Sequence, residues 1–103
     1  MIQDEIRTLL AAPASGTGAP SLASIEHTLT TGYAEALALE AQRWRIERRI
    51  GEIGAALSDG EQATRTSELA TLSRDLARTQ KDLTLLRALL SSLRERAAGA
   101  RAA

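Results

Sequence analysis

The stretch "LATLSRDLARTQKDLTLLRALLSSL", Leu69 to Leu93, places a leucine at nearly every third or fourth position. Steps of three and four residues in alternation meet Leu69, Leu72, Leu76, Thr79, Leu83, Leu86, Leu90, Leu93 and Ala97, of which only Thr79 is polar. This is the spacing of the a and d positions of a coiled coil, which lie along one face of a helix. It predicts one long helix, over about residues 61–98, that packs its apolar face against another helix.

A second run with the same spacing begins earlier in the chain. Its positions are Leu22, Ile25, Leu29, Gly32, Ala36, Leu39, Arg43, Ile46, Ile50, Ile53 and Leu57, and they predict a helix over 21–57. Between the two runs, Gly60 can take the left-handed conformation that ends a helix, and Ser58 with Glu61 fits a capping box. A turn at 58–60 makes the two helices antiparallel neighbours. We call their facing a and d positions the seam.

The composition favours helices over strands. The chain of 103 residues suits a single domain, and its 44% hydrophobic share is that of an ordinary globular protein. Valine and phenylalanine are absent, so there is little from which to build a sheet, whereas alanine, leucine, arginine and glutamate all favour helix. The predicted fold is all-α: an antiparallel two-helix coiled-coil hairpin with a short N-terminal helix. Two copies of such a hairpin would make a four-helix bundle.

The part of the chain before the hairpin divides into two segments. Residues 1–12 predict a short amphipathic helix, with Ile2, Ile6, Leu9 and Leu10 at helical spacing. Residues 13–20, "PASGTGAP", are small, uncharged and framed by prolines, which predicts a flexible linker. The hairpin then occupies 21–103.

The charges and side-chain sizes suggest how the two long helices are aligned. If the chain folds back on itself at the turn, the acidic half of the first helix lies beside the basic half of the second. This alignment predicts that Glu26 lies near Arg94. The same alignment places Gly32 opposite Leu86, a small residue against a large one. Gly51 and Gly54, near the turn, indicate either another close approach or a weakened helix end.

A second apolar stripe lies outside the seam, and it is the predicted partner or oligomer surface. Its members are Tyr33, Leu37 and Trp44 on the first long helix, and Leu85 and Leu89 on the second. Either the N-terminal helix or a second copy of the chain could cover this stripe. We favour a homodimer, because a lone hairpin of this size has a thin core.

Two polar residues interrupt the seam, Arg43 and Thr79, and both are candidate specifiers of register or partner. For Arg43 the favoured interpretation is that its side chain reaches the edge of the seam and pairs with Asp75 across the hairpin. The alternative is a buried charge that selects the partner.

The charge pattern argues against a dedicated nucleic-acid site. Lysine and arginine number 13, aspartate and glutamate 13, so the formal net charge is +0. In the arginine-rich stretch "RWRIERR", residues 43–49, helical spacing puts Glu47 beside Arg43, and Glu52 beside Arg48. Two alternatives remain: a nucleic-acid-associated regulator that uses the basic C-terminal helix, and a peripheral membrane protein that uses the N-terminal helix.

The sequence contains no recognisable catalytic, cofactor or metal motif. There is no cysteine, and the single histidine, His27, predicts a surface position near a helix start. We therefore expect no enzyme activity, no cofactor and no small-molecule substrate. The acidic start "MIQDEIRTLL" does not resemble a signal peptide, so the expected location is the cytoplasm. The leading hypothesis is a non-catalytic helical-hairpin interaction module, either a small oligomerising adaptor or an assembly subunit, whose partner is a protein or a second copy.

Overall fold

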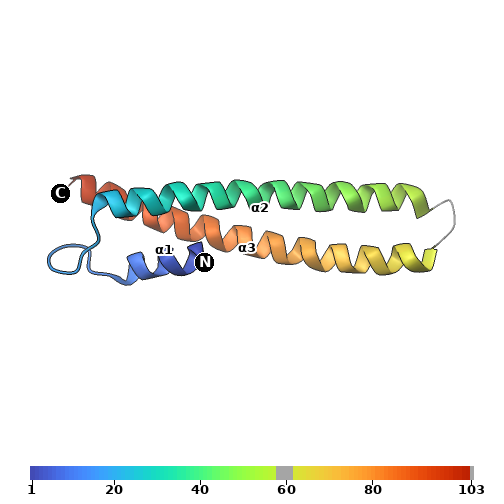
Figure 1. The fold of residues 1–103 in the computed structure, drawn as a ribbon, viewed down its shortest axis with the longest axis horizontal. Helices are drawn as coiled ribbons and strands as arrows, with labels where there is room; N and C mark the ends of the chain where they lie inside the picture. Colours follow the sequence, from blue (N-terminus) through green and yellow to red (C-terminus); the bar gives the residue numbers. More distant parts are fainter. Residues whose placement is uncertain (58–61, 103) are drawn as a thin grey trace. The chain divides into compact units, whose positions relative to one another are not determined.

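The described part of the chain is all-α, as the sequence predicts. A computed structural model describes residues 1–57 and 62–102, and the predicted turn at 58–60 with its Ser58–Glu61 capping box lies outside them. The elements are α1 (Ile2–Ala11), α2 (Leu22–Ala56) and α3 (Gln62–Ala102). Helices α2 and α3 pack against each other as an antiparallel pair, which confirms the hairpin (Figure 1). No strand occurs within the described ranges.

The predicted seam is the core of this pair. None of its positions on α2 and α3 is exposed: each is buried or half-buried, from Leu22 through Ile53 on the first helix and from Leu69 through Ala97 on the second. The most enclosed side chains among them are Ile53, Leu83, Leu86 and Leu93. The alternation of three and four residues therefore identified the packed face of both helices correctly.

The chain forms two compact units. The first comprises Met1–Leu37 with Thr84–Ala103, and the second comprises Ala38–Leu83. In the first unit three helices meet, and Leu86, Leu90 and Leu93 are buried. In the second unit only α2 and α3 are present, and several seam residues, Ile46, Ile50, Leu72 and Leu76 among them, stay half-buried. Two helices alone enclose fewer side chains than three, although Ile53 and Leu83 of this unit are buried.

Local signals set the helix starts. The hydroxyl of Ser21 accepts a hydrogen bond of 3.1 Å from the backbone N–H of Ser24, which caps the start of α2. Asp4 and Glu5 lie in the first turn of α1, where the positive end of the helix dipole favours carboxylates. Between α1 and α2, Gly16 and Gly18 take φ values of 78° and 86°, a left-handed conformation that glycine adopts without strain.

Helix α2 runs without interruption through the threonines and glycine at 30–32. Thr30 and Thr31 each donate a hydroxyl hydrogen bond to the carbonyl four residues earlier, on Glu26 and His27, so their side chains are satisfied within the helix. Gly32 sits in a close contact: a Cβ there would overlap the Cδ2 of Leu90 and lie 3.6 Å from the Cδ1 of Ile6. The prediction of a continuous helix with a close approach at Gly32 is confirmed.

Two details of the predicted alignment are wrong, and one of two alternatives is excluded. Gly32 faces Leu90, one helical turn further along α3 than Leu86. Glu26 pairs with Arg101 at 2.7 Å, about two turns beyond the predicted Arg94, because α3 continues as helix past residue 98 to Ala102. Gly51 and Gly54 meet nothing within 4 Å of a built Cβ, so neither is a close approach. Reflection about an assumed turn fixes which helix faces are paired, but it leaves the register uncertain by a turn or two.

Candidate functional site

The first unit contains a docking site for α1 on the seam of the hairpin. Ile6 is 0% exposed, and it lies against Gly32 of α2 in the space that the missing side chain leaves. Leu90 of α3 closes the same contact. The N-terminal helix therefore packs on its own hairpin, which was one of the two arrangements that the sequence left open.

Arg96 of α3 holds the other end of α1. Its guanidinium donates a hydrogen bond of 2.8 Å to the carbonyl oxygen of Leu10 and a second to the carbonyl oxygen of Ala12. The last carbonyls of a helix have no partner within the helix, and α1 has no basic residue in its last turn. Arg96 supplies from another helix the cap that α1 lacks.

The residues of the predicted partner surface are largely exposed. The exposed fractions are 41% for Tyr33, 67% for Leu37, 60% for Trp44 and 40% for Leu85, while Leu89 is half-buried. Tyr33, Leu37, Leu85 and Leu89 belong to the first unit, and Trp44 belongs to the second. Their role as a partner surface stays a prediction.

The four residues of the predicted partner surface that belong to the first unit lie on two different faces of it. Leu89 and Leu85 precede Arg96 by seven and eleven residues, so each lies within about 20° of Arg96 around α3, on the face that holds α1. On α2, Thr28 borders the hollow beside α1. Leu37 is nine residues further, which is about 180° around the helix, and Tyr33 is about 140° from Thr28. Tyr33 and Leu37 therefore face away from α1.

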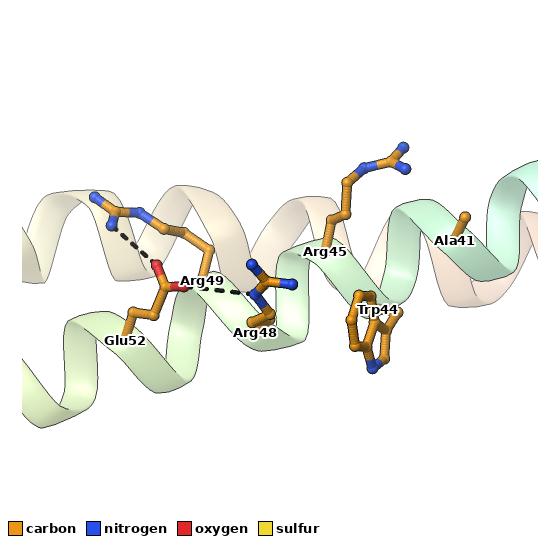
Figure 2. Close-up of a pocket in the computed structure, with 6 residues that line it drawn as sticks. All are labelled: Ala41, Trp44, Arg45, Arg48, Arg49 and Glu52. Carbon is orange, nitrogen blue, oxygen red and sulfur yellow. Dashed lines mark hydrogen bonds and ion pairs between the residues drawn. The ribbon is translucent and has the colours of Figure 1, made fainter.

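In the second unit, Trp44 borders an open hollow on the outer side of α2 (Figure 2). Its lining residues are Ala41, Trp44, Arg45, Arg48, Arg49 and Glu52. The guanidinium carbon of Arg48 lies 5.3 Å from the centre of the Trp44 ring, a cation–π distance. The basic stretch and the tryptophan thus share one surface feature.

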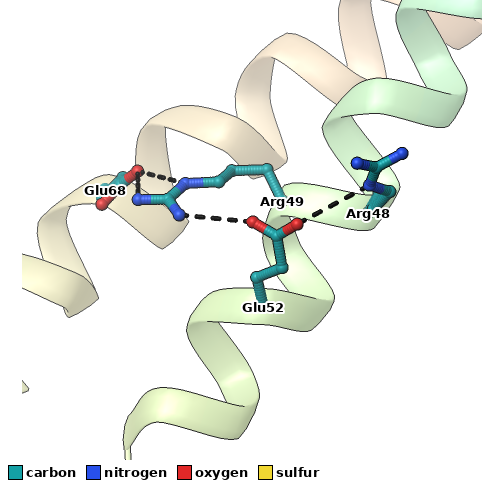
Figure 3. A network of polar contacts seen from close by, with 4 residues as sticks. All are labelled: Arg48, Arg49, Glu52 and Glu68. Atoms are coloured by element: carbon teal, nitrogen blue, oxygen red, sulfur yellow. Dashed lines mark hydrogen bonds and ion pairs between the residues drawn. The ribbon is translucent and has the colours of Figure 1, made fainter.

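An ionic network stands next to this hollow and ties α2 to α3 (Figure 3). Arg49 contacts Glu68 of α3 at 2.9 Å and Glu52 of its own helix at 3.4 Å, and Glu52 also lies 3.6 Å from Arg48. The hydrogen bond that Arg49 donates to the carboxylate of Glu68 is the main cause of the raised pKa of Arg49. The raised pKa keeps the Arg49 guanidinium charged up to strongly alkaline pH, so the arginine side of these ion pairs is lost only there. The ion pairs also require Glu68 and Glu52 to be ionised.

The two polar seam residues behave differently from each other. Thr79 is 3% exposed, and its hydroxyl accepts a hydrogen bond of 3.3 Å from the side-chain amide of Gln42. Arg43 is half-buried and pairs with Glu47 of its own helix at 3.6 Å. Its ion pair is with Glu47, which helical spacing places beside it, and not with Asp75 across the hairpin. A four-residue spacing on one helix brings Glu47 within reach at little entropic cost.

Other chemical features within the described ranges are few. His27 is exposed near the start of α2, as predicted. Among the described residues no cluster of three or more His, Cys, Asp or Glu side chains is placed to hold a metal ion. No described helix carries an apolar stretch long enough to cross a bilayer.

Sequence reasoning missed Arg96 as a positioning residue. The sequence signal that could have pointed to such a residue is in α1, which ends without a basic residue or a glycine cap and so leaves its last carbonyls unpaired within the helix. Comparison with known proteins adds no further information: no family model, no curated protein and no solved structure matches the chain. The fold and the site together describe a small helical hairpin with a docked N-terminal helix.

Proposed function

We propose that the chain is a non-catalytic protein–protein interaction module, a small oligomerising adaptor or assembly subunit. It binds its partner through Tyr33 and Leu37, the surface that we call the outer face of α2. The observation that supports this most is the exposure of Leu37, 67%, in a unit where the seam residues Leu29, Leu86, Leu90 and Leu93 are buried. Tyr33 stands one turn earlier on the same face and is 41% exposed. Their spacing of four residues places the two apolar side chains next to each other on the surface of α2.

The docking of α1 strengthens this choice of surface. The N-terminal helix occupies the side of the first unit where Arg96 lies, together with Leu89 and Leu85. It therefore does not cover Tyr33 and Leu37, so a partner from outside the chain is the remaining way to remove these two side chains from water. Removal of apolar surface is the main driving force of most protein association.

The test uses single charged substitutions on the two faces. Leu37→Glu is expected to abolish co-purification of the partner from the native host, or to convert an oligomer into a monomer by light scattering. Ser92→Glu, at an exposed position of α3 in the same unit, is the matched control. If Leu37→Glu folds normally by circular dichroism and changes neither the bound proteins nor the mass, the proposed surface is wrong.

A homodimer and a separate protein partner give different results in the same experiment. A mass of two chains for the purified protein, reduced to one by Leu37→Glu, identifies the second copy as the partner. A monomer at all concentrations that loses a bound protein on the same substitution identifies an adaptor.

A further inference from the structure

Of the arginines that line the hollow beside Trp44, only Arg45 forms no ion pair within the described part of the chain. Arg43 pairs with Glu47, Arg48 with Glu52, and Arg49 with Glu52 and Glu68. Arg45, by contrast, makes no ion pair or hydrogen bond with any residue in 1–57 or 62–102, and Figure 2 shows its guanidinium directed away from Glu52. In a stretch where every other arginine has a carboxylate nearby, Arg45 is left available for a carboxylate from outside.

The shape of the hollow follows from helix geometry. Trp44 and Arg45 stand three and four residues after Ala41, so both side chains rise beside its small methyl group. Arg48, one turn further on, closes the other end and stacks on the Trp44 ring. The result is an open hollow of about 480 Å³ with an aromatic wall on one side and a free guanidinium on the other.

We propose that this hollow binds an acidic, amphipathic segment of a partner protein, with a carboxylate on Arg45 and a neighbouring apolar side chain against Trp44. Three arginines and one glutamate line it, so the local charge favours an anionic occupant. The guanidinium fork matches a carboxylate through two parallel hydrogen bonds. Tryptophan and arginine are also the residues that most often carry the binding energy of a protein interface.

The charges favour a protein segment over nucleic acid. Affinity for a phosphate backbone rises with the number of phosphates that free cations neutralise. Here Arg48 and Arg49 already form ion pairs with Glu52 and Glu68, and the chain as a whole has a formal net charge of +0. One free arginine beside an aromatic ring matches a single carboxylate next to an apolar side chain.

This inference rests on the proposed function and specifies the chemistry of the partner. Trp44 is the only tryptophan, so its fluorescence reports directly on the hollow. The intact chain is titrated with a helical peptide of leucine and glutamate, with the same peptide carrying lysine in place of glutamate, and with single-stranded oligothymidylate. The leucine–glutamate peptide is expected to shift the emission and to bind at least about tenfold more tightly than either of the others.

Charge reversal gives the decisive comparison. Arg45→Glu is expected to weaken the glutamate peptide about tenfold or more and to gain binding of the lysine peptide. Arg78→Glu is the matched control, because Arg78 is exposed on α3 in the same unit and likewise makes no contact of this kind with a described residue. Equal binding of both peptides, tighter binding of oligothymidylate, or an Arg45→Glu variant that binds like the parent would each overturn the inference.

The two proposals can fail separately. A chain that still loses its partner on Leu37→Glu, but ignores the glutamate peptide up to about 1 mM, is an interaction module whose Trp44 hollow does not bind acidic segments. A concentration-dependent shift of Trp44 emission without any peptide shows that a second copy occupies the hollow, and it contradicts the inference in the same way.

Discussion

The guanidinium of Arg96 donates a hydrogen bond of 2.8 Å to the carbonyl oxygen of Leu10, which lies 86 residues earlier in the sequence. This contact explains why a helix as short as α1 is present at all. An isolated helix of 10 residues is marginal in water, and α1 has no side-chain cap at its start. Its buried residue Ile6 on one side and Arg96 at its end are the contacts that stabilise it most clearly.

Replacement of Arg96 is therefore expected to loosen α1 without unfolding the hairpin. Arg96→Met keeps the apolar stem but removes both hydrogen bonds to α1, at a cost on the order of 1–3 kcal/mol to the docking of α1. Hydrogen exchange should then speed up within residues 2–11 and stay unchanged at Leu83 and Leu86. Arg94→Met, at an exposed neighbouring position, is the control and should leave all of these rates unchanged. Slow exchange in α1 of Arg96→Met would show that Ile6 alone holds the helix.

Two glycines in α2 should respond to alanine in opposite directions. At Gly51 the added methyl group meets open space, so Gly51→Ala should raise the free energy of unfolding by about 0.5–1 kcal/mol through helix propensity alone. At Gly32 the same methyl group overlaps Leu90, which is buried and has little room to move. Gly32→Ala should therefore lower the free energy of unfolding by about 1 kcal/mol overall. Denaturant unfolding of the two variants checks this, and an equal gain at both positions would mean that Gly32 is not in a close contact.

The ionic network of Arg49 should contribute to stability in a way that depends on salt. Arg49→Gln removes its contacts with Glu68 and Glu52, so the Tm should fall at low ionic strength. The difference from the parent should shrink in about 0.5 M salt, because the charges are exposed and screened. Arg45→Gln should leave the Tm unchanged at both salt concentrations, since no described carboxylate faces it. Equal losses for the two variants would indicate that general charge, and not the bridge to α3, sets the stability.

The seam was predictable because its signal is local and repeated. Each leucine from Leu69 to Leu93 adds to one periodic pattern, so errors at single positions such as Thr79 do not change the result. The docking of α1 was not predictable in the same way. The sequence of residues 13–20 does not predict where the connector directs α1, and the contact of Ile6 with Gly32 depends on the packed pair of helices.

The pairing of charges between the two long helices was the least predictable feature, whereas the pairs Arg43–Glu47 and Arg48–Glu52 within α2 followed from their spacing. A long arginine side chain reaches more than one turn of a neighbouring helix, so Glu26 selects Arg101 where the reflected register offers Arg94. Arg43 likewise pairs with Glu47 on its own helix and not across the hairpin. Exposed pairs of this kind differ by no more than about 1 kcal/mol, and sequence spacing alone does not rank such small differences.

Site-specific photocrosslinking tests the central claim, that a protein covers the outer face of α2, most directly. A photoreactive phenylalanine analogue replaces Leu37 in one version of the chain and the exposed Ser92 in another, and both are irradiated in the native host. The account predicts a discrete protein adduct, either a second copy or a partner, at position 37 and none at position 92. The absence of an adduct at 37, or equal labelling at both positions, would contradict it.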